Sequence, residues 1–211
     1  MQQYADTVEL IALAAGAALA SGINLYAVML VLGLLGRFAA VELPPGMELL
    51  QHPLVLGAAG AMFLAEFVAD KIPGLDSLWD ALHTFIRIPA GGLLAAAAAA
   101  PVGPDFALAS GILGAGLAAS THATKAGGRL LINTSPEPLS NWGASLGEDA
   151  LVIAAMWLAV YHPWLFIGAA ALFLLLLAWL LPKFWRGVRM LFARIARLFR
   201  AGAPPARDCR P

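Results

Sequence analysis

The side chains best suited to chemistry gather between residues 66 and 87. They are Glu66, Asp70, Asp76, Asp80, His83 and Arg87. The last four follow one another at intervals of four, three and four residues, so a helix would present them on one face. Such a stripe could form ion pairs, relay a proton or anchor a charged substrate. We expect Glu66 and Arg87 to lie deepest. Asp70, Lys71 and Asp76 are expected to meet water at a helix end.

The remainder of the chain is too apolar for a water-soluble fold. Of its 211 residues, 61% are hydrophobic and 12% are charged, against roughly 45–50% and about 25% in soluble domains. Lipid is therefore the expected solvent for much of the surface. A charged side chain within a span costs at least ~2.5–3.5 kcal/mol on insertion scales, so those near Glu66 and Arg87 should face the interior and pair.

Six apolar segments are long enough to cross a bilayer, which takes roughly 20 residues each. They are residues 8–36, 53–71, 79–100, 104–124, 143–161 and 163–182. Their composition predicts helices, so the expected fold class is an all-α polytopic membrane helix bundle of about six spans. The first segment is too long for one straight span. Ser21, Gly22 and Asn24 offer a polar break within it.

A second polar interruption is predicted in the fourth segment, where Ser120, Thr121, His122 and Lys125 occur. Unwound backbone at membrane depth is tolerated only where it is buried or lines a cavity. Two interruptions indicate either a binding site near the membrane midplane or close packing of small residues between helices. Both interpretations place these residues inside the bundle, and His122 is the histidine we would test for proton coupling.

Two short matches indicate an internal repeat. Residues 61–67 resemble residues 155–161, and residues 16–20 resemble residues 114–118. With three spans in each half, the halves would have opposite topologies. This predicts an inverted 3+3 repeat with interrupted helices, an architecture found in many secondary transporters. Chance similarity in a background rich in Ala and Leu is the alternative.

Basic residues predict the orientation. Eight of the thirteen Lys and Arg residues follow residue 182. Six spans with both termini in the cytoplasm would also place Lys71, Lys125 and Arg129 inside, and only Arg37 outside. The positive-inside rule favours this arrangement in an inner (plasma) membrane.

The expected domain organisation follows from these segments. A transmembrane helical domain covers residues 1–182, with repeat halves 8–100 and 104–182. Residues 183–200 place basic side chains on one face and apolar ones on the other, which predicts an amphipathic helix on anionic lipids. Residues 201–211 are expected to be disordered.

The segment 125–149 reads as a long loop before the fifth span. Glu148 and Asp149 at its end predict either a helix cap or a second carboxylate pair facing the first. The four histidines lack the spacing of a metal site, and Cys209 is the single cysteine. No nucleophile elbow is present. We therefore expect no metal, cofactor, nucleic-acid partner or enzymatic activity.

Several motifs together carry a family resemblance. They are the stretch from Ala65 to Asp80, the stretch from Phe85 to Gly91, and residues 21–26, 120–125 and 135–138. In these motifs the chain resembles a bacterial membrane family catalogued as a domain of unknown function. The resemblance covers roughly residues 8–182. It implies a multi-pass inner-membrane protein and supplies no activity.

The leading hypothesis is a small inverted-repeat transporter or channel for an ion, a small solute or a lipid headgroup. Its path would lie between residues 21–24 and 119–125, near Glu66, Asp80, His83 and Arg87. The alternative is a non-transporting scaffold that recruits partners through residues 183–200. A homo-oligomer is compatible with so small a bundle.

Overall fold

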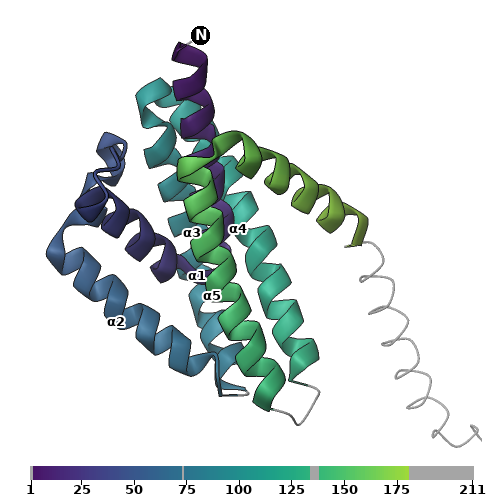
Figure 1. The fold of residues 1–211 in the computed structure, drawn as a ribbon. Coiled ribbons are helices and arrows are strands. Elements are labelled where there is room, and N and C mark those ends of the chain that lie inside the picture. Colours follow the sequence, from purple (N-terminus) through teal and green to yellow (C-terminus); the bar gives the residue numbers. More distant parts are fainter. Residues whose placement is uncertain (1, 73, 134–137, 181–211) are drawn as a thin grey trace, which may run out of the picture. The chain divides into compact units, whose positions relative to one another are not determined.

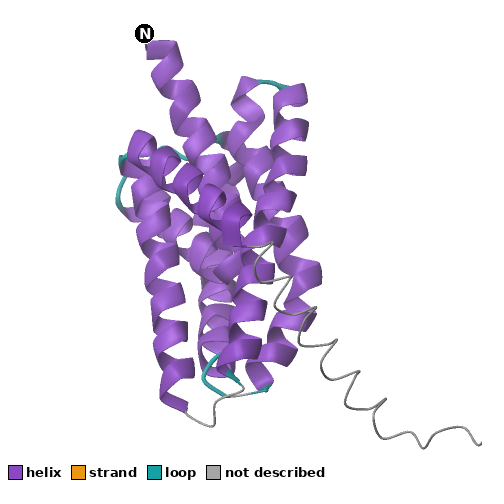
Figure 2. Ribbon diagram, turned by 90° about the vertical axis from the view of Figure 1, so that its right-hand side faces the viewer, coloured by secondary structure: helices purple, strands orange, loops and turns teal. Residues whose placement is uncertain are grey.

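The computed structural model describes residues 2–72, 74–133 and 138–180. Every regular element in these ranges is a helix, which confirms the predicted all-α class (Figure 2). Residues up to Ile167 form one compact unit, and the chain from Gly168 onward belongs to a second. The predicted amphipathic helix at 183–200 and the tail at 201–211 lie outside the described residues.

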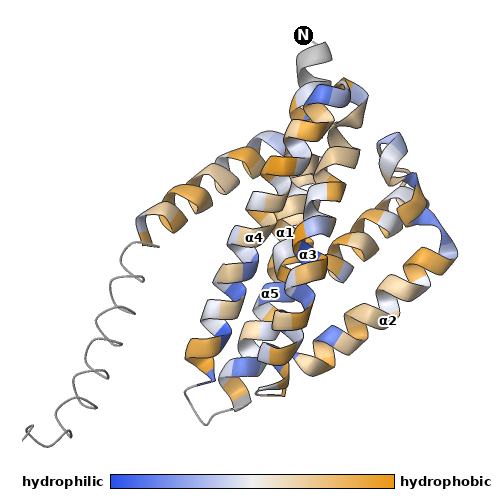
Figure 3. Ribbon diagram, turned by 180° about the vertical axis from the view of Figure 1, so that it is seen from behind, coloured by the Kyte–Doolittle hydropathy of each residue, from blue (hydrophilic) through white to orange (hydrophobic). Residues whose placement is uncertain are grey.

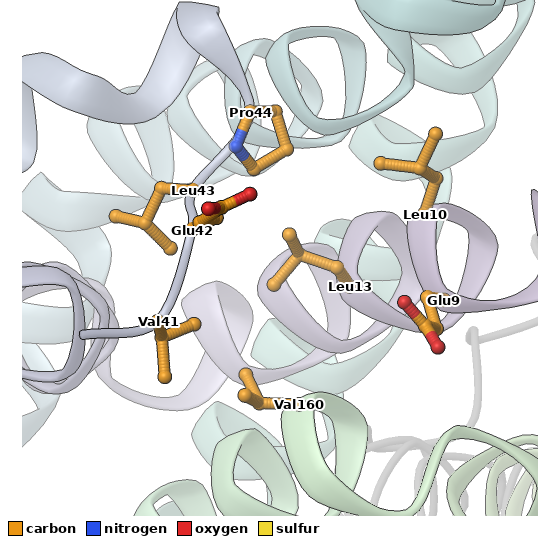
Figure 4. Close-up of a pocket in the computed structure, with 8 residues that line it drawn as sticks. All are labelled: Glu9, Leu10, Leu13, Val41, Glu42, Leu43, Pro44 and Val160. Carbon is orange, nitrogen blue, oxygen red and sulfur yellow. The ribbon is translucent and has the colours of Figure 1, made fainter. Parts of the chain in front are cut away.

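Helix α1 (Gln2–Phe38) doubles back on itself. Asn24 has extended backbone angles (φ −147°, ψ 97°), which divide α1 into two half-helices. The first half descends to the middle of the bundle in Figure 1, and the second half rises from there. Glu9 and Leu13 therefore line the same cavity of about 460 Å³ as residues 41–44 (Figure 4). We call this element the re-entrant hairpin and Ser21–Asn24 its tip.

The second half of α1 packs against the two elements that follow it. These are the 3₁₀ helix η1 (Pro45–Gln51) and helix α2 (Pro53–Ala69), which meet at 70°. Gly33 lies against the Leu50 carbonyl and the Leu56 side chain, and Gly60 lies against the Leu30 side chain. The second half of α1 and helix α2 therefore run side by side in opposite directions.

The remaining described helices follow α2 along the chain. They are α3 (Leu75–Ala99), the short 3₁₀ helix η2 (Ala100–Val102), α4 (Pro104–Ile132), α5 (Pro138–Tyr161) and the helix over Pro163–Leu180. By length and composition, five described helices could cross a membrane, or six if η1 and α2 form one bent span. One of the five is Thr7–Phe38, the part of α1 that the break at Asn24 turns back. Large apolar side chains such as Leu93, Leu108 and Ile112 are exposed, and Figure 3 colours much of the helical ribbon as apolar. The chain is a multi-pass membrane protein.

The helices of the first unit run between a lower end and an upper end. The lower end holds the ends of α2 and α4 and the starts of α3 and α5, as drawn in Figure 1. The upper end holds the start of α1, residues 39–52 and η2.

Small residues seal the upper half where α1, α3 and α4 meet. Gly91 and Ala95 of α3 pack against Ala118 and Gly114 of α4, with Ala18 of α1 between them. A Cβ atom added to Gly91 would lie 2.6 Å from the Cβ of Ala118. The three backbones approach this closely because small residues leave no side-chain layer between them. We call this contact the small-residue seam.

The structure corrects two expectations about local structure. Residues 119–125 are helical within α4, so the predicted second interruption is wrong. Helix α3 also continues through Pro89. The predicted loop over 125–149 is wrong as well, since α4 extends to Ile132 and α5 begins at Pro138. The polar side chains bond inside the bundle, so the backbone around them keeps its helical hydrogen bonds.

The hairpin also bears on the topology. Helix α1 doubles back whereas α4 is continuous, so the structure does not confirm the repeat suggested by residues 16–20 and 114–118. The six-span arrangement expects the N-terminus and Arg37 on opposite sides, but the first half of α1 and residues 41–44 line one cavity at the upper end. That expectation is wrong, because a helix that turns back in mid-bundle returns the chain to its starting side.

Cysteine accessibility tests the hairpin. In a Cys209→Ser background, Glu9→Cys and Glu42→Cys should react from the same side of sealed vesicles with a membrane-impermeant maleimide. Ile72→Cys, exposed near the lower end, should react from the opposite side. Labelling of positions 9 and 42 from opposite sides would contradict the hairpin.

A pair of glycines tests the packing at the tip. A Cβ atom on Gly22 would collide with the Thr121 hydroxyl and the Ala118 carbonyl, whereas one on Gly116 would meet nothing within 4 Å. Gly22→Ala should therefore cost about 1–3 kcal/mol, measured as a lower melting temperature in detergent. Gly116→Ala should melt like the wild type, and equal melting of both variants would show that the tip is not packed as described.

Candidate functional site

Five helices bring polar side chains into the lower half of the bundle. Glu66 and Asp70 end α2, Asp80 and Arg87 lie on the first half of α3, and Lys125 and Arg129 lie on the second half of α4. Helix α5 adds Glu148, and the tip of α1 lies above them. Six of these seven side chains are no more than 3% exposed, and Glu148 is 20% exposed. We call these seven residues the ion network.

Lys125 stands at the centre of the ion network. Its Nζ lies 2.9 Å from Asp70 Oδ2, 3.2 Å from Glu66 Oε1, 3.6 Å from Glu148 Oε2 and 3.7 Å from Asp80 Oδ1. One ammonium is therefore shared by four carboxylates from three helices. The same Nζ donates a hydrogen bond of 3.1 Å to the Ile23 carbonyl, which joins the network to the tip.

Two arginines flank Lys125. The Arg87 guanidinium lies 2.7 Å from both Glu66 Oε1 and Asp80 Oδ1. Arg129 pairs with Glu148 at 2.6 Å and with Asp70 at 3.2 Å. Arg87 stands 12 residues after the start of α3, about 18 Å along a helix from its lower end. The ion pairs therefore extend from the lower end to near the middle of the bundle.

Asn24 satisfies the backbone where the hairpin breaks. Its Oδ1 accepts a hydrogen bond of 3.0 Å from the Ala27 amide, which caps the second half-helix. Its Nδ2 donates to Asp149 Oδ1 at 2.9 Å. Thr121 Oγ1 donates to the Leu19 carbonyl at 2.8 Å. Polar groups from α4 and α5 thus hold the tip.

Two histidines, His83 and His122, contact side chains of neighbouring helices. His83 Nε2 lies 3.1 Å from the Tyr26 hydroxyl, and its ring stacks on Trp79. His122 Nε2 lies 2.7 Å from Thr84 Oγ1, and its other nitrogen lies 3.4 Å from Arg87. Among the described residues, no group of three His, Cys, Asp or Glu side chains is arranged to hold a metal ion.

The predicted site residues separate into three groups. Glu66, Asp80, Arg87 and Lys125 lie in the ion network. The others that lie beside it or at the tip are Ser21, Gly22, Asn24, His83, Thr121 and His122. Ser120 stands apart, because its hydroxyl donates only to the Leu117 carbonyl one turn earlier.

Sequence reasoning missed part of the site. Asp70 and Asp76 were expected to meet water, yet they are 2% and 0% exposed. Asp76 lies at the lower end, where Asn133 and Asn141 donate to its carboxylate. Arg129 was treated as a loop residue. Its position one turn after Lys125 is a signal that could have placed both on one helix face.

Lys71 differs from the buried cations. It lies in the segment between α2 and α3, and its Nζ donates to the Phe67 carbonyl at 3.0 Å and lies over the Phe67 ring. Burial lowers the pKa of this ammonium, while nearby carboxylates partly oppose the shift.

Comparison with known proteins gives a family and no activity. The sequence model of a family described as a domain of unknown function (DUF4126) matches residues 11–183. No curated protein and no solved structure matches the chain.

Arg87 tests the energetics of the ion network. Arg87→Met should destabilise the fold by about 3–5 kcal/mol, because it leaves Glu66 and Asp80 charged and without their guanidinium. The loss should appear as reduced monodisperse protein after extraction and a lower melting temperature. The double variant Glu66→Gln/Arg87→Met should recover part of it.

Arg37→Met serves as the control, because Arg37 is exposed; its described contacts are a hydrogen bond to the Gln51 carbonyl and the ring of the adjacent Phe38. It should behave like the wild type. If Arg87→Met matched this control, the buried ion pairs would not hold the fold.

Proposed function

Because the chain belongs to the DUF4126 family, whose description gives no activity, we propose a function from the geometry: a membrane transporter for an ion, a small solute or a lipid headgroup. The observation that carries the proposal is the ion network itself. It connects the lower end to the tip of a re-entrant hairpin near the middle of the bundle. In many transporters, the substrate or ion site lies near the middle of the membrane, where a helix is interrupted.

Helix packing alone does not account for the ion network. Taking ions out of water costs several kcal/mol each, and replacing a buried ion pair by well-packed apolar residues is often neutral or stabilising. A scaffold would gain nothing from placing seven charged side chains, most of them fully buried, in its interior. Intramembrane charges of this kind usually line substrate or ion paths.

The small-residue seam supports a transporter rather than an open channel. The lower half is polar and charged, whereas the upper half is closed by contacts such as Gly91 with Ala118. A substrate path through the bundle would have to open at the seam after the tip had moved. Alternating access of this kind uses movement of packed helices around a central site.

The basic residues support an orientation with the lower end in the cytoplasm. Lys71 and Arg129 lie near that end, and eight more basic residues follow residue 182. With the hairpin returning α1 to the upper end, the N-terminus would then face outside and the C-terminus inside. The inner membrane remains the proposed location.

Flux measurements test the proposal. Purified protein in liposomes on a solid support should give protein-dependent currents for at least one of a panel of inorganic ions, organic ions and zwitterions. Lys125→Met should reduce that signal by about tenfold or more, because Lys125 joins the carboxylates to the tip. For a lipid headgroup, the assay would measure how fast fluorescent lipid analogues move between the two leaflets, from the fraction that dithionite quenches.

Lys71→Met is the matched control, since Lys71 donates to the Phe67 carbonyl at the end of the preceding helix and forms no described ion pair. It should transport like the wild type. Folded wild-type protein that moves none of these substrates would contradict transport and favour the scaffold, whose partners would then be sought through residues 183–200.

A further inference from the structure

The ion network contains more acid than base. Its four carboxylates each turn one oxygen toward Lys125, and its other cations are Arg87 and Arg129. If every group were ionised, four negative charges would face three positive ones. An uncompensated charge in a region of low dielectric is costly, so the interior favours a state in which the excess is neutralised.

Three of the carboxylates have a second oxygen without a partner. These atoms are Glu66 Oε2, Asp70 Oδ1 and Asp80 Oδ2, and each is fully buried with no hydrogen bond from any described residue. The three residues are 0%, 2% and 1% exposed. A proton bound at one of these oxygens would remove the charge that lacks compensation. Glu148 differs, because its side chain is 20% exposed.

The titratable groups around the ion network do not remove its excess of negative charge. The other titratable side chains around the network are Tyr26 of α1, Lys71 after α2, Asp76 and His83 of α3, His122 of α4 and Asp149 of α5. Including them gives six carboxylates against four Lys and Arg cations. His83 Nε2 lies 3.1 Å from the Tyr26 hydroxyl, and His122 Nδ1 lies 3.4 Å from the Arg87 guanidinium. The carboxylate oxygens of the described residues do not form a metal-binding group.

We propose that the ion network binds one exchangeable proton, shared among the carboxylates of Glu66, Asp70 and Asp80, and that this proton is the coupling ion of the transporter proposed above. The second part rests on the proposed function. Hydronium at the lower end would transfer a proton to a carboxylate oxygen and leave water, and release would reverse that step. Coupled carboxylates of this kind share their protons, so the proton belongs to the group of three.

The contacts also give the proton a mechanical effect. Lys125 Nζ holds Glu66, Asp70 and the Ile23 carbonyl at 3.2, 2.9 and 3.1 Å. Protonating Glu66 or Asp70 weakens the attraction that keeps the ammonium in place. The bond to Ile23 then loosens, and with it the attachment of the tip to α4. Proton binding at the carboxylates would in this way change the position of the hairpin.

Infrared spectroscopy tests the proton directly. Wild-type protein in nanodiscs near neutral pH should show the C=O stretch of about one protonated carboxyl per chain, and this band should shift in heavy water. It should disappear as the pH rises. Glu66→Gln leaves three carboxylates with three cations, so the band should be absent. Asp80→Asn also removes one carboxylate from the network, on α3, and should abolish the band too. It replaces Glu66→Gln in the experiment if that variant folds poorly.

Two control variants test whether the band comes from the carboxyl groups of the ion network. Glu42→Gln changes an exposed carboxylate and should keep it. Asp149→Asn should keep it too, although Asp149 has a buried oxygen of its own. Loss of the band in Asp149→Asn but not in the network variants would overturn the assignment, as would a folded wild type without the band.

The buffer distinguishes a proton from a metal cation. In choline buffer at constant pH, adding Na⁺ or K⁺ should leave the band unchanged. If the added cation removes it, the network binds that cation in place of a proton and the proposal is wrong. The spectrum needs no substrate, so it can fail while transport is observed, and it can succeed where no flux is found.

Discussion

The attraction between the Lys125 ammonium and the carboxylates around it is the interaction on which the lower half of the bundle depends. Four carboxylates from three helices lie within 3.7 Å of one nitrogen, and two guanidiniums share them. Water is excluded from most of these groups, so each cation is needed to offset the desolvation of its neighbours. This explains why α2, α3, α4 and α5 meet here through ions, whereas small residues join the upper half.

The re-entrant hairpin depends on the same interaction. Breaking α1 at Asn24 leaves backbone groups unpaired in the interior, where each would cost several kcal/mol. Asn24, Thr121 and Lys125 bond to those groups, and Asp149 holds Asn24 in turn. The tip is thus supported by polar side chains that also border the ion network. Movement of the tip and a change of charge in the network are therefore physically linked.

Much of this arrangement could be predicted from sequence, and the reasons for the failures are specific. The excess of apolar residues predicted a helical membrane bundle, and the excessive length of the first segment predicted the break near Asn24. Helical spacing predicted that Asp80 and Arg87 share a face. The local sequence could not predict the direction that the second half of α1 takes after the break, because that direction depends on packing against α2. Residues 119–125 were misread because polar side chains that bond across helices resemble those of an unwound segment.

A structure of the protein in lipid nanodiscs tests the central claim most directly. The account predicts that the tip at Asn24 lies near the bilayer midplane and that Lys125 contacts Glu66, Asp70 and Asp80 away from water. Both ends of α1 should reach the same membrane surface. A straight α1 that crosses the bilayer, with Lys125 and Arg87 hydrated at the membrane surface, would contradict the account.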